Sequence, residues 1–277
     1  MVHGSYNLYN RYRDAGRTNL NGEKGSSPMT FNRLDLSNQH IFISGAGGAI
    51  GSAAARACAM LGATLTLSDL SSPEEIAQEL RANGCTARPL ALDNCDRHEV
   101  TRQVNGLLPL DALIDCSGFY RQGEWNADDD SWDDLLAQTL TVNVRGPVNL
   151  VRAVLPGMIA RRSGRIVLIG SLAARTGGTS LTVEPAYAAS KGALHTLVRY
   201  FARQVAAHGV VVNAVAPGPI LTPMLRAAHK SLSAAEYPME RLGEPEEIGW
   251  PAAFLASRAA TFMTGTVIDA NGGIAFS

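Results

Sequence analysis

Short apolar segments alternate with longer segments of helical periodicity along most of this chain, and this alternation limits its possible folds more than any other feature. Several of the short segments are almost continuously apolar, as strands are when both faces of a parallel sheet are covered. The pattern predicts a single α/β domain: a doubly wound parallel sheet of about seven strands with helices on both faces. The predicted strands are residues 40–44, 64–68, 87–92, 112–115, 165–169, 210–215 and 266–270, and the predicted helices are 50–61, 73–83, 97–107, 132–161 and 187–208.

Composition narrows the class of partner. Apolar residues make up 46% of the 277 residues and the formal net charge is -1, so the chain offers no basic surface to a nucleic acid or to an anionic membrane. We therefore expect a small-molecule ligand, no nucleic acid and no membrane. The four cysteines are far apart, and no apolar stretch reaches the roughly 18 residues of a membrane span. A cytoplasmic protein without a metal site is predicted.

The first 36 residues differ from the rest of the chain. They are rich in Asn, Gly, Arg, Ser and Tyr and show no sustained apolar period, so residues 1–36 are predicted to form a disordered N-terminal extension. Residues 37–277 are predicted to form the folded domain. A regulatory or targeting role for the extension and a tail without any role are both open interpretations.

A glycine-rich turn follows the first predicted strand, in the segment Ile41-Phe-Ile-Ser-Gly45-Ala-Gly47-Gly48-Ala-Ile-Gly51. Glycines let a pyrophosphate approach the backbone closely, and the start of the following helix offers unpaired N–H groups. The segment therefore predicts a nucleotide phosphate site, the alternative being a turn with a structural role only. The residues expected to contact the nucleotide are Ser44, Gly45, Gly47, Ala49, Ile50 and Gly51.

Asp69 ends the second predicted strand, 18 residues beyond Gly51. An acidic side chain at this place accepts hydrogen bonds from both ribose hydroxyls and repels a 2′-phosphate. Leu70 follows Asp69, where a basic residue would have favoured that phosphate. The sequence thus predicts NAD as the cofactor, with NADP less favoured. The alternative is that Asp69 only caps a helix or forms a turn.

Tyr187 and Lys191 are four residues apart in a predicted helix, so their side chains lie on one face of it. A phenol is a poor base at neutral pH because its pKa is near 10, and a neighbouring cation is the usual means of stabilising the phenolate. The pair is therefore a candidate acid/base site. A surface pair without chemistry is the alternative for this spacing taken alone.

Other motifs surround this pair in a definite order. The buried strand Arg165-Ile-Val-Leu-Ile-Gly170-Ser171 ends in a hydroxyl, and Asn143 lies in Thr141-Val-Asn-Val. Another predicted strand is followed by the turn Pro217-Gly218-Pro-Ile-Leu-Thr222, and Asp269-Ala-Asn-Gly-Gly273 lies near the C-terminus. With these motifs the chain resembles the short-chain dehydrogenase/reductase family from about residue 37 to the C-terminus. Ser44 and Ala49 depart from the family pattern T-G-x-x-x-G-x-G.

The resemblance implies a Rossmann-like catalytic domain that interconverts a secondary alcohol and a ketone by hydride transfer, and it implies a homotetramer. Tyr187 would be the general acid/base, and Ser171 would bind the substrate oxygen. Lys191 would hold the nicotinamide ribose and lower the pKa of Tyr187, and Asn143 would anchor a water leading from Lys191 to solvent. Tyr187 and Lys191 would also contact the cofactor. The other contacts carried over by position are Asp93, Gly118, Pro217, Gly218 and Thr222.

Two regions depart from the family or are left open by it. Asp115-Cys-Ser-Gly118 replaces the usual Asn-Asn-Ala-Gly, so the bracing of the fourth strand is expected to differ. The loop at residues 172–186 is longer than usual, and residues 221–237 are expected to form a lid. Glu184, Tyr120 and Arg121 are candidates for contact with a polar substrate, the alternative being ordinary solvated side chains.

Three other functions stay as alternatives. The first is an NADPH-dependent 3-oxoacyl-type reductase, which Asp69 argues against. The second is a non-catalytic module that senses nucleotides, which the presence of both Tyr187 and Lys191 disfavours. A structural or nucleic-acid-binding protein ranks last, because the chain has no basic patch and no aromatic platform.

Overall fold

A computed structural model of the chain describes residues 33–107, 109–126, 130–178, 183–228 and 237–276. Within these residues, a single sheet of seven parallel strands has the order β3-β2-β1-β4-β5-β6-β7. The strands are β1 (His40–Ser44), β2 (Thr64–Asp69), β3 (Ala87–Ala91), β4 (Ala112–Asp115), β5 (Gly164–Ile169), β6 (Val210–Pro217) and β7 (Val267–Ala270). The predicted doubly wound sheet is confirmed.

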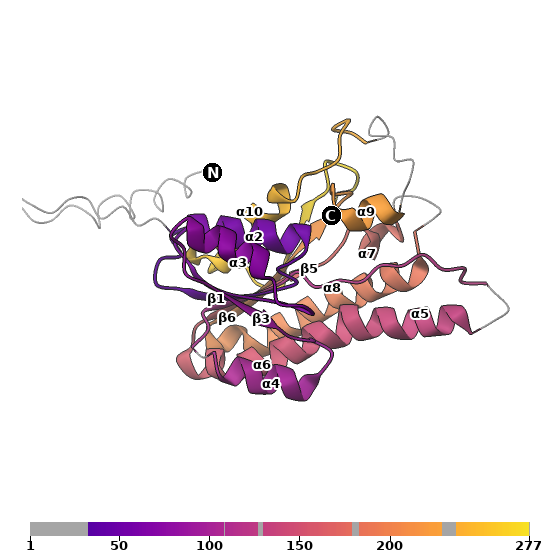
Figure 1. Cartoon of the computed structure of the whole chain (residues 1–277). Coiled ribbons are helices and arrows are strands. Elements are labelled where there is room, and N and C mark those ends of the chain that lie inside the picture. The colour runs from indigo at the N-terminus through magenta and orange to yellow at the C-terminus, as the bar shows by residue number, and fades with distance from the viewer. Residues whose placement is uncertain (1–32, 108, 127–129, 179–182, 229–236, 277) are drawn as a thin grey trace, which may run out of the picture. The chain divides into compact units, whose positions relative to one another are not determined.

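Helices cover both faces of this sheet (Figure 1). On one face, α2 (Ala49–Met60), α3 (Glu74–Ala82) and α10 (Glu246–Ala256) pack over a core that includes Ile41. On the other, α4 (Arg97–Asn105), α6 (Gly146–Arg161) and α8 (Pro185–Val205) pack over a core that includes Phe42. Ile41 and Phe42 serve opposite cores because successive side chains of a strand point to opposite faces.

The strand order reverses at β1, which has β2 on one side and β4 on the other. Ser44, at the end of β1, is in register with Ser68 of β2 and with Asp115 of β4. In open α/β sheets a ligand crevice forms beyond the carboxyl ends of the strands at such a reversal. The motif residues that follow β1, β2, β4 and β5 therefore meet at one edge of the sheet.

The predicted helix at residues 132–161 is interrupted. It consists of α5 (Ser131–Leu140), a π-helical segment η1 (Thr141–Arg145) and then α6. Single π-helical turns inside α-helices occur frequently at functional sites. This one holds Asn143, whose side chain is fully buried.

Two features of the core differ from the sequence-based expectation. Helix α10 was not among the predicted helices, and it contains Pro251. A Cβ on its Gly249 would lie only 2.7 Å from the backbone carbonyl carbon of Ala53 in α2. That glycine lets the two helices touch. Leu36, assigned above to the extension, is fully buried and its N–H donates to the carbonyl of Leu61. Residues 1–32 of the predicted extension lie outside the described residues.

The remaining described elements are α7 (Ala173–Thr176), α9 (Pro223–Ala228), η2 (Ala206–His208) and η4 (Arg258–Ala260). Helix α9 falls in the predicted lid, of which residues 229–236 lie outside the described part, as do residues 179–182 of the lengthened loop. In the part of the chain that is described, no helix is both long enough and apolar enough to cross a bilayer.

Candidate active site

The glycine-rich turn joins β1 to α2 and packs tightly on itself. Gly45 has a φ of +70°, which disfavours a side chain, and a Cβ there would lie 2.6 Å from the backbone nitrogen of Ser117. A Cβ on Gly51 would overlap the carbonyl oxygen of Gly45 and lie 2.8 Å from the Cα of Ala46. No side chain caps the start of α2 at Gly48, so the turn presents an uncapped, electropositive helix N-terminus.

We expect Gly51→Ala to destabilise the folded protein by about 3 kcal/mol, because the added methyl group meets backbone atoms that cannot move aside. The thermal midpoint should fall by roughly 6–12 °C in differential scanning fluorimetry. Gly48→Ala is the matched control, since a Cβ there lies 3.4 Å from the nearest atom and φ is −78°. Equal melting of both variants would contradict the packing argument.

Asp69 links the end of β2 to this turn. One carboxylate oxygen accepts a hydrogen bond from the N–H of Gly47 at 3.0 Å, and the other accepts from the N–H of Leu70 at 2.8 Å. Each oxygen can accept a further hydrogen bond, so the carboxylate is held in place and still has capacity for a ligand.

A cavity of about 420 Å³ runs along the turn and the ends of the neighbouring strands. A pyrophosphate suits the uncapped start of α2, and ribose hydroxyls suit the oriented carboxylate of Asp69. The residues present therefore fit a nicotinamide dinucleotide. Of the residues predicted to contact the cofactor, this cavity is lined by Ser44, Gly45, Gly47, Ala49, Ile50, Gly51, Asp69, Asp93, Gly118 and Thr222.

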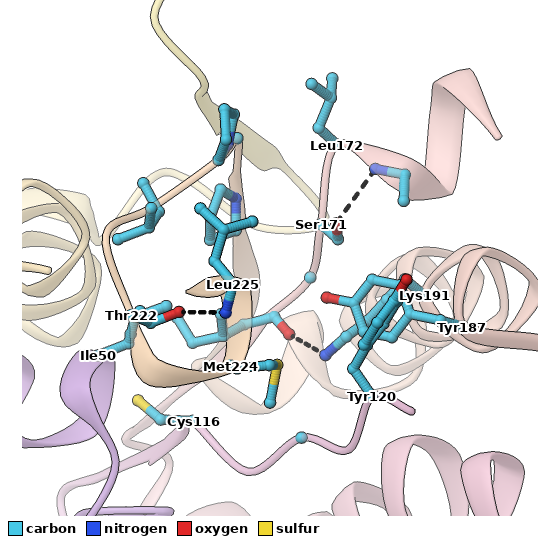
Figure 2. Close-up of a pocket in the computed structure, with 18 of the residues that line it drawn as sticks. Ile50, Cys116, Tyr120, Ser171, Leu172, Tyr187, Lys191, Thr222, Met224 and Leu225 are labelled. Carbon is cyan, nitrogen blue, oxygen red and sulfur yellow. Dashed lines mark hydrogen bonds between the residues drawn. The ribbon is translucent and has the colours of Figure 1, made fainter. Parts of the chain in front are cut away.

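A second cavity of about 180 Å³, drawn in Figure 2, adjoins the first, because Gly118, Thr222 and Met224 line both. We call it the Tyr187 cavity. Three of the four predicted catalytic residues, Ser171, Tyr187 and Lys191, line it, as do the predicted cofactor contacts Pro217 and Gly218. Asn143 is not in its described lining.

Tyr187 and Lys191 lie in the first turns of α8, and their side chains reach the cavity from the same wall (Figure 2). The Lys191 Nζ is 5.7 Å from the centre of the Tyr187 ring and donates a hydrogen bond to the carbonyl of Ile169 at 2.9 Å. Burial lowers the pKa of Lys191 to about 8, although the Asp115 carboxylate opposes this.

The pKa of Tyr187 is raised by burial, and a hydrogen bond with the Ser171 hydroxyl opposes the rise. Lys191 Nζ lies 5.7 Å from the centre of the Tyr187 ring, and its expected effect on this pKa stays a prediction.

Ser171 lies directly after β5, where the chain turns into α7. Its hydroxyl oxygen accepts a hydrogen bond from the N–H of Ala173 at 3.1 Å (Figure 2). This bond fixes the Ser171 side chain at the start of α7. Its own N–H donates to Nε2 of His195 at 3.4 Å.

Asn143 is positioned by the π-helical segment η1 and is completely buried. Its amide oxygen accepts from the N–H of Phe119 at 2.7 Å, and its amide nitrogen donates to the carbonyl of Phe119 at 2.9 Å and to the Ser190 hydroxyl at 3.0 Å. Asn143 therefore clamps the loop after β4 against α8, close to Gly118.

Two polar residues of this region were not predicted. Asn94 follows β3 and donates to the Ser44 hydroxyl at 2.6 Å; the rule that ligands gather beyond strand ends could have found it. His195 lies one helical turn beyond Lys191, so the spacing rule applied to Tyr187 would have placed it on the same face of the helix. Burial, with nearby Arg175 and Arg199, lowers the pKa of His195 to about 4.

The changed motif after β4 is braced by its own acidic residue. Asp115 is 2% exposed, and one of its oxygens accepts from the N–H and the hydroxyl of Ser117 at 3.0 and 2.6 Å. Burial raises the pKa of Asp115, while Ser117 and Lys191 oppose the rise. Burial likewise raises the pKa of the Cys116 thiol well above its usual value.

Across the described residues, no group of three or more His, Cys, Asp or Glu side chains is placed to hold a metal ion.

Known proteins resemble this chain over most of its length. A family model described as enoyl-(acyl carrier protein) reductase matches residues 45–275. Galactitol 2-dehydrogenase (L-tagatose-forming) of Cereibacter sphaeroides is 36% identical over 245 residues, which cover 83% of this chain and 92% of that protein. The 3-oxoacyl-(acyl-carrier-protein) reductase of Pseudomonas aeruginosa is 34% identical over 255 residues, covering 88% and 100%.

Solved structures agree with this assignment. A protein from Beutenbergia cavernae, described as an NAD(P)-dependent gluconate 5-dehydrogenase with bound NADP, superposes with a TM-score of 0.81 at 32% identity, covering 87% of this chain and 98% of that one. A 3-oxoacyl-(acyl-carrier protein) reductase of Brucella melitensis with bound NAD gives 0.79 at 29% identity, covering 92% and 98%. The chain therefore belongs to the short-chain dehydrogenase/reductase family and is an NAD(P)-dependent oxidoreductase of alcohols and ketones.

Proposed function

We propose that this enzyme uses NAD(H) to interconvert a secondary alcohol and a ketone, with Tyr187 as the general acid/base. The observation that carries the proposal is the junction of two cavities: a glycine-lined groove ending at Asp69 opens into a second cavity lined by Ser171, Tyr187 and Lys191. A cofactor in the groove and a substrate in the Tyr187 cavity would be neighbours.

Each residue has a chemical role that the family resemblance implies. NAD(P), when bound, supplies the carbon that accepts or donates the hydride. Tyr187 returns a proton to the substrate oxygen in ketone reduction and removes it in alcohol oxidation. Ser171 donates a hydrogen bond to the same oxygen and stabilises the charge that develops there. Lys191 holds the nicotinamide ribose, and Asn143 fixes the loop after β4 at Phe119 and anchors a water beside Lys191.

Asp69 is the residue that selects NAD in this proposal. Its carboxylate is fixed by the N–H groups of Gly47 and Leu70, and a 2′-phosphate at this position would meet its negative charge without a compensating base. Leu70, the next residue, lines the same groove.

Asp69→Asn should weaken NADH binding about tenfold and narrow the preference over NADPH by about 100-fold, because the substitution removes the charge and keeps the side-chain shape. Quenching of intrinsic fluorescence during titration with each cofactor measures both values. Equal affinity of the unmodified enzyme for NADH and NADPH, with no shift in the variant, would overturn Asp69 as the selector. A spectrophotometric screen of alcohols and ketones with the preferred cofactor then tests the reaction itself.

A second candidate function is a 3-oxoacyl reductase that uses NADPH. Its support is the matching family model and the Pseudomonas aeruginosa relative, both described as reductases of carrier-bound acyl groups. NADPH preference in the titration above, with reduction of an acetoacetyl thioester, would favour it.

The proposal also places the enzyme in the cytoplasm as a homotetramer. The four cysteines support a reducing compartment, because all of them are unpaired thiols. The family resemblance supports the tetramer, with the long helices α6 and α8 as the faces that would pair.

A further inference from the structure

The Tyr187 cavity has a part that the cofactor groove does not share, and a substrate would lie there. Three catalytic side chains, Ser171, Tyr187 and Lys191, supply polar groups in this part. Apart from them and Tyr120, its described lining consists only of Gly, Ala, Pro, Val, Leu and Ile. The side chains that would surround the substrate beyond its reacting oxygen are Leu172, Ala173, Val183, Pro219, Ile220 and Leu225.

Tyr120 adds an aromatic ring to this wall. The ring meets the Tyr187 ring edge-on, with 5.2 Å between their centres. Its hydroxyl oxygen is buried and has no hydrogen-bond partner among the described residues, and burial raises the pKa of this phenol. Figure 2 shows the two tyrosines on one side of the cavity and Met224 and Leu225 of α9 on the other.

Backbone groups of the wall are also engaged. The carbonyls of Ile169, Pro217 and Pro219 accept hydrogen bonds from Lys191 Nζ, from the N–H of Leu172 and from the N–H of Gly243. The N–H groups of Gly170 and Gly218 donate to the carbonyls of Val215 and Ala270. These five backbone groups are already hydrogen-bonded within the protein, so they are less available to a polyhydroxylated substrate.

Glu184 and Arg121, the nearby charged residues that could have bound a polar substrate, do not belong to the described lining of the cavity. Glu184 is 2% exposed and is not in the described lining, and its two oxygens accept from the Trp132 indole N–H at 2.9 Å and from the N–H of Tyr187 at 2.8 Å. Arg121 is exposed and also lies outside that lining. Lys191 is the one cation of the described lining, and the reaction uses it.

We infer that the substrate is uncharged and is flanked by hydrocarbon on both sides of its reacting carbon, in contrast to the sugar alcohols and sugar acids named for several relatives. This inference rests on the proposed oxidoreductase function. Each substrate hydroxyl left without a partner in such a wall costs about 1–3 kcal/mol, so an apolar alcohol is strongly favoured over a polyol.

The test compares four alcohols with NAD: cyclohexanol and 1-phenylethanol as hydrocarbon probes, galactitol as a polyol and gluconate as a charged polyol. We expect kcat/KM to be at least about 100-fold higher for the hydrocarbon pair. Val183→Thr changes shape little and adds one hydroxyl to the wall, so it should lower kcat/KM for cyclohexanol about fivefold and leave NADH affinity unchanged. Arg121→Ala should leave every rate unchanged.

A binding measurement separates the substrate class from the reaction. Tyr187→Phe loaded with NAD is titrated calorimetrically with cyclohexanol and with galactitol, and tighter binding of cyclohexanol is expected. Preferred turnover of galactitol or gluconate, or loss of that turnover in Arg121→Ala, would overturn the substrate class while the proposed function stands. Tighter cyclohexanol binding with no turnover by the unmodified enzyme would retain the class and overturn the proposed function. Equal binding of both alcohols would overturn the class.

Discussion

Tyr187→Phe should reduce kcat for ketone reduction and for alcohol oxidation by about 10³-fold, because it removes the hydroxyl that we propose transfers the substrate proton. The ring remains, so its edge-on contact with Tyr120 and the packing of α8 are kept. NADH affinity is therefore expected to stay within about threefold and the thermal midpoint within about 2 °C. Steady-state kinetics, fluorescence titration and scanning fluorimetry provide the three values.

The pH dependence gives a second readout of the same group. Burial raises the pKa of Tyr187, so the phenol keeps its proton at neutral pH and is ready to donate it in ketone reduction. Reduction by the unmodified enzyme should weaken as pH rises toward that pKa, and oxidation should increase over the same interval. Both trends should disappear from the residual rate of Tyr187→Phe.

Tyr200→Phe is the matched control for this substitution. Tyr200 lies on the same helix, 57% exposed, and its ring packs on Phe201 away from the cavity. It should retain full turnover. If Tyr187→Phe also retained turnover within about tenfold, Tyr187 would not be the acid/base and another proton donor would have to be sought.

The sheet could be predicted almost to the residue, because buried parallel strands leave a strong local signal. The predicted ranges of β1 and β4 match the structure, and β6 extends two residues beyond its predicted end, through Pro217. Helix α10 was missed because Gly249 and Pro251 interrupt its sequence pattern and only its contact with α2 explains them.

Site residues could be predicted from the sequence where their place on a single helix or strand is enough to position them. Tyr187 and Lys191 follow from helical spacing, and Asp69 from the end of a strand. The π-helical turn around Asn143 was not predictable, because it depends on contacts with Phe119 and Ser190 from other parts of the chain. The same is true of the Lys191 amine, whose direction toward Ile169 is set by burial in the fold.

Lys191→Met should lose about 100-fold in turnover and at the same time gain about 1–3 kcal/mol in the free energy of unfolding at pH 7. The loss follows from removal of the ammonium that holds the ribose beside Tyr187 in the proposed mechanism. The gain in stability follows from removal of a buried charge, since Lys191 is only 3% exposed. It is partly offset because the carbonyl of Ile169 loses its hydrogen bond from Lys191.

The gain in the free energy of unfolding from Lys191→Met should decrease as pH rises. The pKa of Lys191 falls from 10.5 to about 8 on folding, so the folded protein binds fewer protons than the unfolded chain between these values. The cost of burying the ammonium is complete below pH 8 and is relieved as pH rises toward 10.5. The advantage of Lys191→Met in thermal midpoint should thus be largest near pH 7 and become small near pH 10.

Asp115 makes this prediction sharper. Its carboxylate raises the pKa of Lys191 against the effect of burial, so removing the carboxylate increases the cost of the buried ammonium. In an Asp115→Asn background, Lys191→Met should therefore gain more stability than it does alone, which a double-mutant cycle measures as a coupling free energy. A lower thermal midpoint for Lys191→Met at both pH 7 and pH 10 would mean that the attraction between Lys191 and the Asp115 carboxylate outweighs the burial cost, and the lowered pKa would not describe the buried amine.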